Sequence, residues 1–156
     1  MADETTEPGA LDQGTENAAL REVLAAEHAA VWGYGVVGAA LDPSAQGLAA
    51  VSETAHRDVR DRVVELLAER DADPVGAEGA YALPFPVLSA TDAAALAVVL
   101  EDGVAAAWVR VLDQAVERTT REIAVGTLTA AEVRAVGWRI TAGQAPATRA
   151  FPGLPE

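Results

Sequence analysis

The stretch that decides the fold is ADPVGAEGAYALPFPVLS, residues 72–89. Its two glycines and three prolines exclude a continuous helix, and Pro84 and Pro86 favour extended backbone. A long segment without secondary structure inside a compact domain needs a structural reason. A helix of about 26 residues is roughly 39 Å long, and an extended segment of this length can span that distance. We therefore predict a crossover that joins two long helices starting at the same end of a bundle.

Two antiparallel helices are predicted before the crossover, at residues 16–41 and 43–71. In the first helix, one row of residues runs from Leu20 to Leu41 in alternating steps of four and three. Such a row keeps one side of a helix against a partner. Glu27 belongs to this otherwise mostly apolar row. The following Asp-Pro pair suits the start of a new helix, so the turn between the two helices should be tight.

Two further helices are predicted after the crossover, at residues 91–115 and 117–142. Ser89 and Asp92 resemble a capping pair for the first of them. We place the break between these helices near residues 114–117, because four helices of similar length result. A capping box at Thr129-x-x-Glu132 would place the break later and give helices of unequal length.

The predicted fold is therefore all-α: a bundle of four helices over residues 16–143, with a long crossover between the second and third helices. This is the ferritin-like arrangement. Residues 1–15 carry acids and no base, so we expect a disordered tail there. Residues 144–156 are rich in proline, and we expect an extended tail that packs Phe151 and Leu154 on the bundle.

Composition excludes several classes of function. The 156 residues include no cysteine and no lysine, so disulfides, thiolate chemistry and Schiff-base lysines are ruled out. The net charge of −13 makes nucleic acid and anionic membranes poor partners. The sequence shows neither a signal-peptide pattern nor an apolar run of about 20 residues, so we expect a cytoplasmic protein.

One motif is a false lead. The segment GYGVVG, residues 33–38, matches the glycine pattern of dinucleotide-binding folds. That pattern requires a preceding strand and a helix that begins within it. Here it lies inside a predicted helix, where glycines let a neighbouring helix approach closely.

The candidate site consists of acids and histidines that fall on the predicted core. Ferritin-like di-metal sites take one Glu from each of two helices and Glu-x-x-His from each of the other two. The first helix offers Glu27, the second offers Glu53 and His56, and the third offers Glu101. The fourth helix has no histidine. His28, the other histidine of the chain, is adjacent to Glu27 and points about 100° away from it.

Two interpretations stay open. In the favoured one, the acids and His56 form a buried hydrogen-bonded network in a non-catalytic protein without a cofactor, joined by an arginine such as Arg57 or Arg60. In the alternative, Glu27, His28, Glu53, His56 and Glu101 hold one or two iron or manganese ions. Tyr34 and Tyr81 are candidate supporting residues in either case. We further expect a homo-oligomer, most simply a dimer.

Five segments together resemble an actinobacterial family of ferritin-like domains of unknown function. They are LAAEHAAVWGYGVVGAAL (24–41), AHRDVRD (55–61), YALPFPV (81–87), LEDGVAAAW (100–108) and AFPGLP (150–155). The resemblance covers about residues 16–155 and implies a ferritin-like bundle but no established activity. The family features that it implies here are Glu27, His28, His56, Arg57, Tyr81 and Glu101. The missing histidine on the fourth helix departs from di-iron proteins of this fold.

Overall fold

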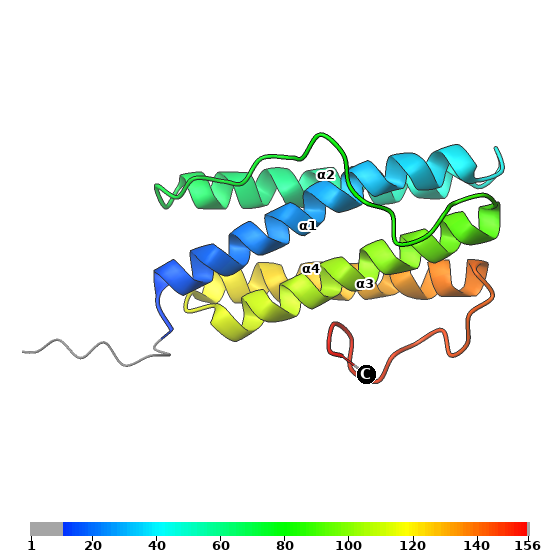
Figure 1. The fold of residues 1–156 in the computed structure, drawn as a ribbon. Helices are drawn as coiled ribbons and strands as arrows, with labels where there is room; N and C mark the ends of the chain where they lie inside the picture. The colour runs from blue at the N-terminus through cyan, green and yellow to red at the C-terminus, as the bar shows by residue number, and fades with distance from the viewer. Residues whose placement is uncertain (1–10, 156) are drawn as a thin grey trace, which may run out of the picture.

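The computed structural model describes residues 11–155 as four helices, with no strand within that range (Figure 1). The helices are α1 (Gln13–Ala40), α2 (Gln46–Ala68), α3 (Ala90–Gln114) and α4 (Arg118–Thr141). None of the helices in the described part of the chain is both long and apolar enough to cross a membrane. The predicted all-α fold is confirmed.

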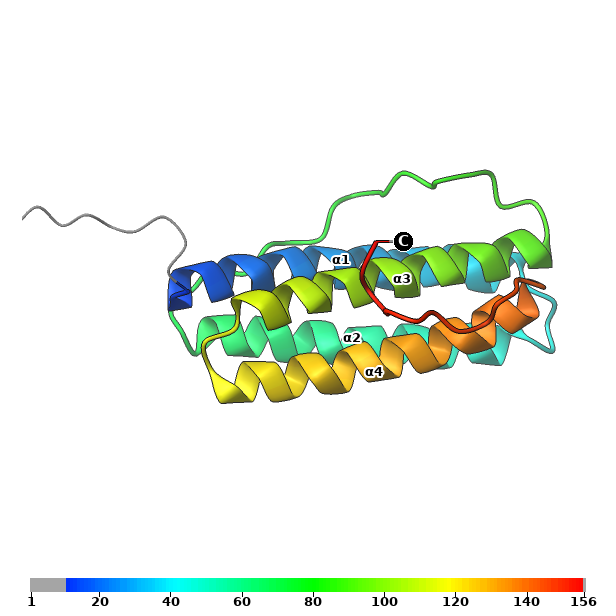
Figure 2. The same cartoon turned by 90° about the horizontal axis from the view of Figure 1, so that it is seen from below.

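The helices form a bundle with α1 packed on α2 and α3, and α4 packed on α3. Two views show α1 and α3 together on one side of the bundle and α2 and α4 on the other side (Figures 1 and 2). The crossover, residues 69–89, runs back along the length of the bundle, so that α2 and α3 are parallel (Figure 1). This return of the chain is the feature that the prolines and glycines of residues 72–89 predict.

The helix ends differ in detail from the predicted ones. Asp12 caps α1, because its carboxylate accepts the Thr15 N–H at 2.7 Å, so the helix includes residues 13–15 of the predicted tail. Residues 1–10 of that predicted tail lie outside the described residues. Helix α2 begins at Gln46 and not at Pro43, because the Asp42 carbonyl first closes a separate turn with the Ala45 N–H at 2.8 Å.

The third and fourth helices separate at residues 115–117, and α4 continues through Gly126. A residue of α1 supports this break. Glu16 is fully buried, and its Oε2 accepts the backbone N–H groups of Val116 at 2.7 Å and Glu117 at 2.9 Å. Its Oε1 accepts the Thr120 hydroxyl and lies 2.7 Å from Arg70. Burial alone would raise the pKa of Glu16, but these hydrogen bonds outweigh it and lower the pKa.

One glycine of the GYGVVG segment has a packing role. A Cβ on Gly33 would lie 2.7 Å from Cδ1 of Leu100 on α3, so glycine lets the two helices approach. The segment lies wholly within α1, as predicted, and the strand that a nucleotide-binding turn needs is absent from residues 11–155.

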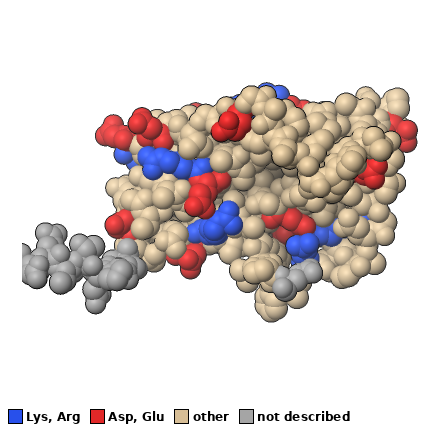
Figure 3. Space-filling view, viewed as in Figure 1, with Lys and Arg blue, Asp and Glu red and all other residues tan. Residues whose placement is uncertain are grey.

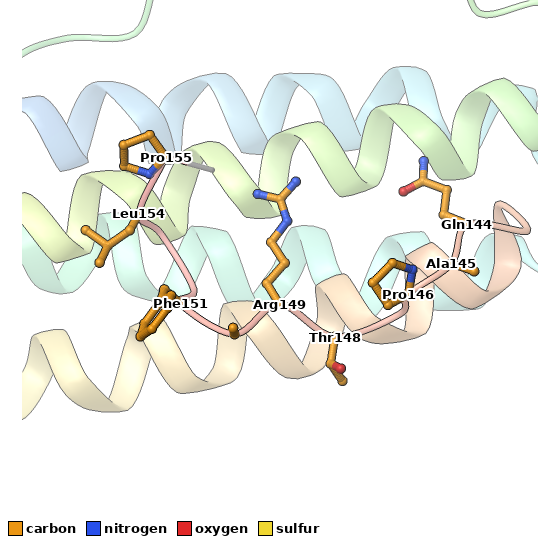
Figure 4. A pocket seen from close by; sticks show the side chains of 9 residues that line it. Gln144, Ala145, Pro146, Thr148, Arg149, Phe151, Leu154 and Pro155 are labelled. Carbon is orange, nitrogen blue, oxygen red and sulfur yellow. The ribbon is translucent and has the colours of Figure 1, made fainter.

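The C-terminal tail, residues 142–155, runs back along α3 and α4 (Figure 2). Arg149 reaches toward α3 (Figure 4) and pairs with Asp102 at 3.0 Å, while Arg139 of α4 donates to the Ala147 carbonyl at 3.1 Å. Phe151 and Leu154 are 72% and 47% exposed, which corrects the expectation that these two side chains pack the tail on the bundle. The tail is held instead by these arginines and by Gly153.

We expect Gly153→Ala to loosen the tail. Gly153 has φ of +74°, and a Cβ there would lie 2.8 Å from the Ala105 carbonyl oxygen. An alanine would be strained by its backbone and blocked by α3, at a cost of about 1–2 kcal/mol. Limited proteolysis should cut the variant faster after residue 142 while circular dichroism of the bundle stays unchanged. Equal cleavage rates would show that Gly153 does not hold the tail.

Candidate functional site

Three ionisable side chains from three helices meet in the middle of the bundle. They are Glu27 of α1, His56 of α2 and Glu101 of α3, and each is fully buried. Apolar clusters lie toward the two ends of the bundle, one containing Trp108 and the other Tyr34. The sequence brings these acids inward because both occupy core-facing rows of their helices.

His56 bridges the two carboxylates. Its Nδ1 lies 2.7 Å from Oε2 of Glu27, and its Nε2 lies 3.2 Å from Oε1 of Glu101. Both ring nitrogens can donate only when the imidazole is protonated. Burial alone would lower the pKa of His56, but the hydrogen bonds and charges of Glu101 and Glu27 outweigh it and raise the pKa to about 9. His56 is therefore an imidazolium at neutral pH.

Two aromatic side chains complete the contacts of the acids. The Trp108 indole donates to Oε1 of Glu27 at 3.1 Å, and the Tyr34 hydroxyl donates to Oε1 of Glu101 at 2.5 Å. The Tyr34 ring also stacks on His56, with ring centroids 5.3 Å apart. Burial, together with the charge of Glu101, raises the pKa of Tyr34, so its hydroxyl remains a donor.

Helix α4 contributes a cation. The Nε of Arg134 donates to Oε1 of Glu101 at 2.8 Å. Although burial alone would raise the pKa of Glu101, its bonds to His56 and Arg134 lower it. We call Glu27, His56, Glu101 and Arg134 the charge network. It holds two carboxylates, one imidazolium and one guanidinium, so its formal charge is zero.

The hydrogen bonds to Glu101 are unevenly distributed. Its Oε1 accepts from Tyr34, His56 and Arg134, whereas its buried Oε2 has no hydrogen-bond partner among residues 11–155. A buried carboxylate oxygen without a donor is costly. The attraction of the two cations therefore has to hold Glu101 in its ionised form.

Several predicted site residues lie outside the charge network, which corrects the predicted set. Glu53 pairs with Arg57 one helical turn away on the surface of α2, with Arg57 Nε at 3.1 Å from Oε1. An i, i+4 pair of this kind turns the Glu53 side chain away from His56. Arg60 likewise pairs with Asp61 at the surface and does not reach the network.

His28 and Tyr81 serve the crossover and not the site. The Nε2 of His28 lies 3.2 Å from the Val75 carbonyl, so the histidine tethers the crossover to α1. The Tyr81 hydroxyl accepts the Glu78 N–H at 3.0 Å, and its ring lies 5.7 Å from the Trp32 ring. Adjacent residues on a helix point in different directions, which is why His28 leaves the core that Glu27 enters.

The charge network does not fit the di-metal site of ferritin-like proteins. Both nitrogens of His56 are bonded to carboxylates, and Glu53 is on the surface. Arg134 brings a positive charge to Glu101 from the helix that should supply the second histidine. No group of three His, Asp or Glu side chains within residues 11–155 is placed to hold a metal ion.

Fold and site together define a ferritin-like four-helix bundle whose centre is filled by an internal ion network. The chain belongs to the DUF4439 family, a domain of unknown function, whose model matches residues 19–156. It is similar to a crystal structure of a conserved hypothetical protein, rv2844, from Mycobacterium tuberculosis. That protein is 39% identical, with a TM-score of 0.80 over 83% of this chain and 98% of that one.

A more distant solved structure shares the fold. It is a dodecameric thioferritin, the bacterioferritin-related protein from Bacteroides fragilis, which is 18% identical over 85% of this chain and 87% of that one, with a TM-score of 0.74. At this identity the similarity concerns the fold alone. No curated protein matched the chain.

Proposed function

We propose that this protein is a non-catalytic ferritin-like bundle in which the charge network stands in place of a metal site. The observation that carries the proposal is that both ring nitrogens of His56 are hydrogen-bonded, one to Glu27 and one to Glu101, while Arg134 neutralises the charge of Glu101. The protein then acts through its surface, as a homo-oligomer, most simply a dimer. A cytoplasmic location and an actinobacterial origin belong to the same proposal, and the Mycobacterium relative supports the latter.

Electrostatics favour this function over the metal-binding alternative. A divalent ion is stabilised by an excess of negative charge and by free lone pairs. Here an imidazolium and a guanidinium already balance two carboxylates. An incoming iron or manganese ion would have to remove the proton of His56 and displace Arg134, which would leave that guanidinium without its carboxylate.

A protein with this charge network should bind little or no iron or manganese. The full chain, purified without a histidine tag or chelator, is incubated with ferrous iron under nitrogen or with manganese and then desalted. We expect less than about 0.1 metal ion per chain by elemental analysis, and no metal-dependent rise in melting temperature, because ligand binding would raise it.

The matched comparison is His56→Ala, checked for folding by circular dichroism. Wild type and variant should give the same low metal content. About one or more ions per wild-type chain, lost in His56→Ala, would overturn the proposal and establish the iron or manganese alternative. The wild-type measurement alone decides the question if the variant does not fold.

A further inference from the structure

The outward side of α4 is free of charge along most of its length. Within residues 124–141, every exposed residue is uncharged, in a chain whose net charge is −13. Val125, Val133 and Ile140 are 53%, 68% and 65% exposed. Their spacings of eight and seven residues place them on one side of the helix. Charged side chains lie elsewhere: some on the face seen in Figure 3, on the opposite side from α4, and others on the C-terminal half of α2, beside the first turns of α4.

Two glycines on this side of α4 leave open space where a Cβ would lie. A Cβ added at Gly126 or Gly137 would meet nothing within 4 Å, and both glycines are inside the helix. Each costs about 1 kcal/mol of helix stability relative to alanine. Exposed glycines that serve no internal contact are suited to the close approach of another backbone. This contrasts with Gly33, whose missing side chain is used by Leu100.

Along this side of α4, large and small residues follow nearly the same order from Val133 toward either end of the helix. Val125 and Ile140 lie almost equally far from Val133, and one glycine lies on each side of it. We propose that α4 pairs antiparallel with α4 of a second copy about a two-fold axis near Val133. This pairing sets Val133 against its own copy and Val125 against Ile140, as a self-complementary interface requires.

The absence of exposed charge on this side of α4 suits a second copy of the same acidic chain. Two chains of charge −13 repel, and this repulsion is weakest where the facing surfaces carry no exposed acids, as on this side of α4. A stable interface buries about 1,200–2,000 Å² in total, more than one pair of helices supplies. Leu48 and Val51, on the half of α2 that lies at the same end of the bundle as the end of α4, are also exposed (Figures 1 and 2). They extend the uncharged surface.

The inference rests on the self-association proposed above and adds its surface and symmetry. The test is sedimentation equilibrium of the full chain over micromolar concentrations. Wild type should be a dimer. Val133→Glu places two carboxylates against each other at the axis and should raise the dimer dissociation constant by at least about 100-fold. Leu88→Glu, at a residue that is 86% exposed outside this surface, should behave as wild type.

The variant Gly137→Ala distinguishes an α4 that forms a dimer interface from an α4 that is only exposed to solvent. In a monomer it should raise the melting temperature, because alanine favours the helix. In the proposed dimer it should weaken association instead. A wild type that is monomeric at all concentrations would overturn self-association and the interface together. A dimer unaffected by Val133→Glu would overturn the interface alone.

Discussion

Glu101→Gln is expected to lower the free energy of unfolding by about 3–5 kcal/mol, the cost of breaking a buried ion pair from one side. The substitution keeps the shape of the side chain and an oxygen that can accept from Tyr34 and Arg134. It removes the negative charge that faces two cations, His56 and Arg134. It also introduces an amide nitrogen at the place of the unpartnered Oε2. Chemical denaturation followed by circular dichroism at pH 7 measures the change.

Glu53→Gln is the matched control, because it makes the same chemical change at a predicted site acid that lies outside the charge network. Glu53 pairs with Arg57 at the surface, and an exposed i, i+4 pair contributes at most about 1 kcal/mol. The two variants should therefore differ by at least about 2 kcal/mol. Equal losses of stability, or a larger loss for Glu53→Gln, would contradict the charge network as the structural centre of the bundle.

The fold was predictable from sequence because its evidence is spread over many residues. The alternating steps from Leu20 to Leu41 and the prolines of the crossover each restrict the backbone independently. Helix ends were less predictable, because they depend on single contacts. The Asp42 carbonyl closes a turn before α2, so α2 begins at Gln46 and not at Pro43. The hydrogen bonds that Glu16 supplies from α1 at the start of α4 are a second contact of this kind. Glu16 is separated from its partners by about 100 residues, and spacing along one helix cannot reveal such a contact.

The site was predictable in part. Glu27 and Glu101 fall on apolar rows, and an acid in such a row must find a partner. Arg134 gives no comparable signal, because a long side chain can reach the core from the flank of a helix. The one available clue was that α4 lacks the histidine of the di-metal pattern, while small residues, Ala131 and Ala135, surround Arg134 and leave room for its side chain. The Glu-x-x-His spacing predicts Glu53 in the site, but Arg57 provides a local partner that keeps its carboxylate at the surface of α2.

The second large effect is a fall in stability between neutral and alkaline pH that depends on His56. Its pKa is raised in the folded state to about 9, against about 6.5 in the unfolded chain. A raised pKa means that the folded state binds the proton more tightly. The stabilisation is therefore fully present below pH 6.5 and is lost as the pH rises through 9. A difference of this size corresponds to about 3 kcal/mol.

Urea denaturation at a series of pH values from 6 to 10 measures this fall. Subtracting the curve of His56→Gln from that of wild type removes the contributions of other groups that titrate in the same range. His28→Gln provides the control, because it removes the other histidine, whose ring contacts the crossover at Val75 and leaves the charge network intact. It should keep the wild-type fall, whereas His56→Gln should lose most of it.

The acid side should behave in the opposite way. The lowered pKa of Glu101 means that its stabilisation is present above its ordinary pKa and is lost as the pH falls through the lowered one. The charge network is thus complete only between these two titrations, and this window distinguishes an ion network from a neutral one. If His56 were neutral and merely packed between the acids, the alkaline fall would be absent and wild type would match His56→Gln in slope. That result would remove the imidazolium, and with it the zero net charge that argues against a bound metal.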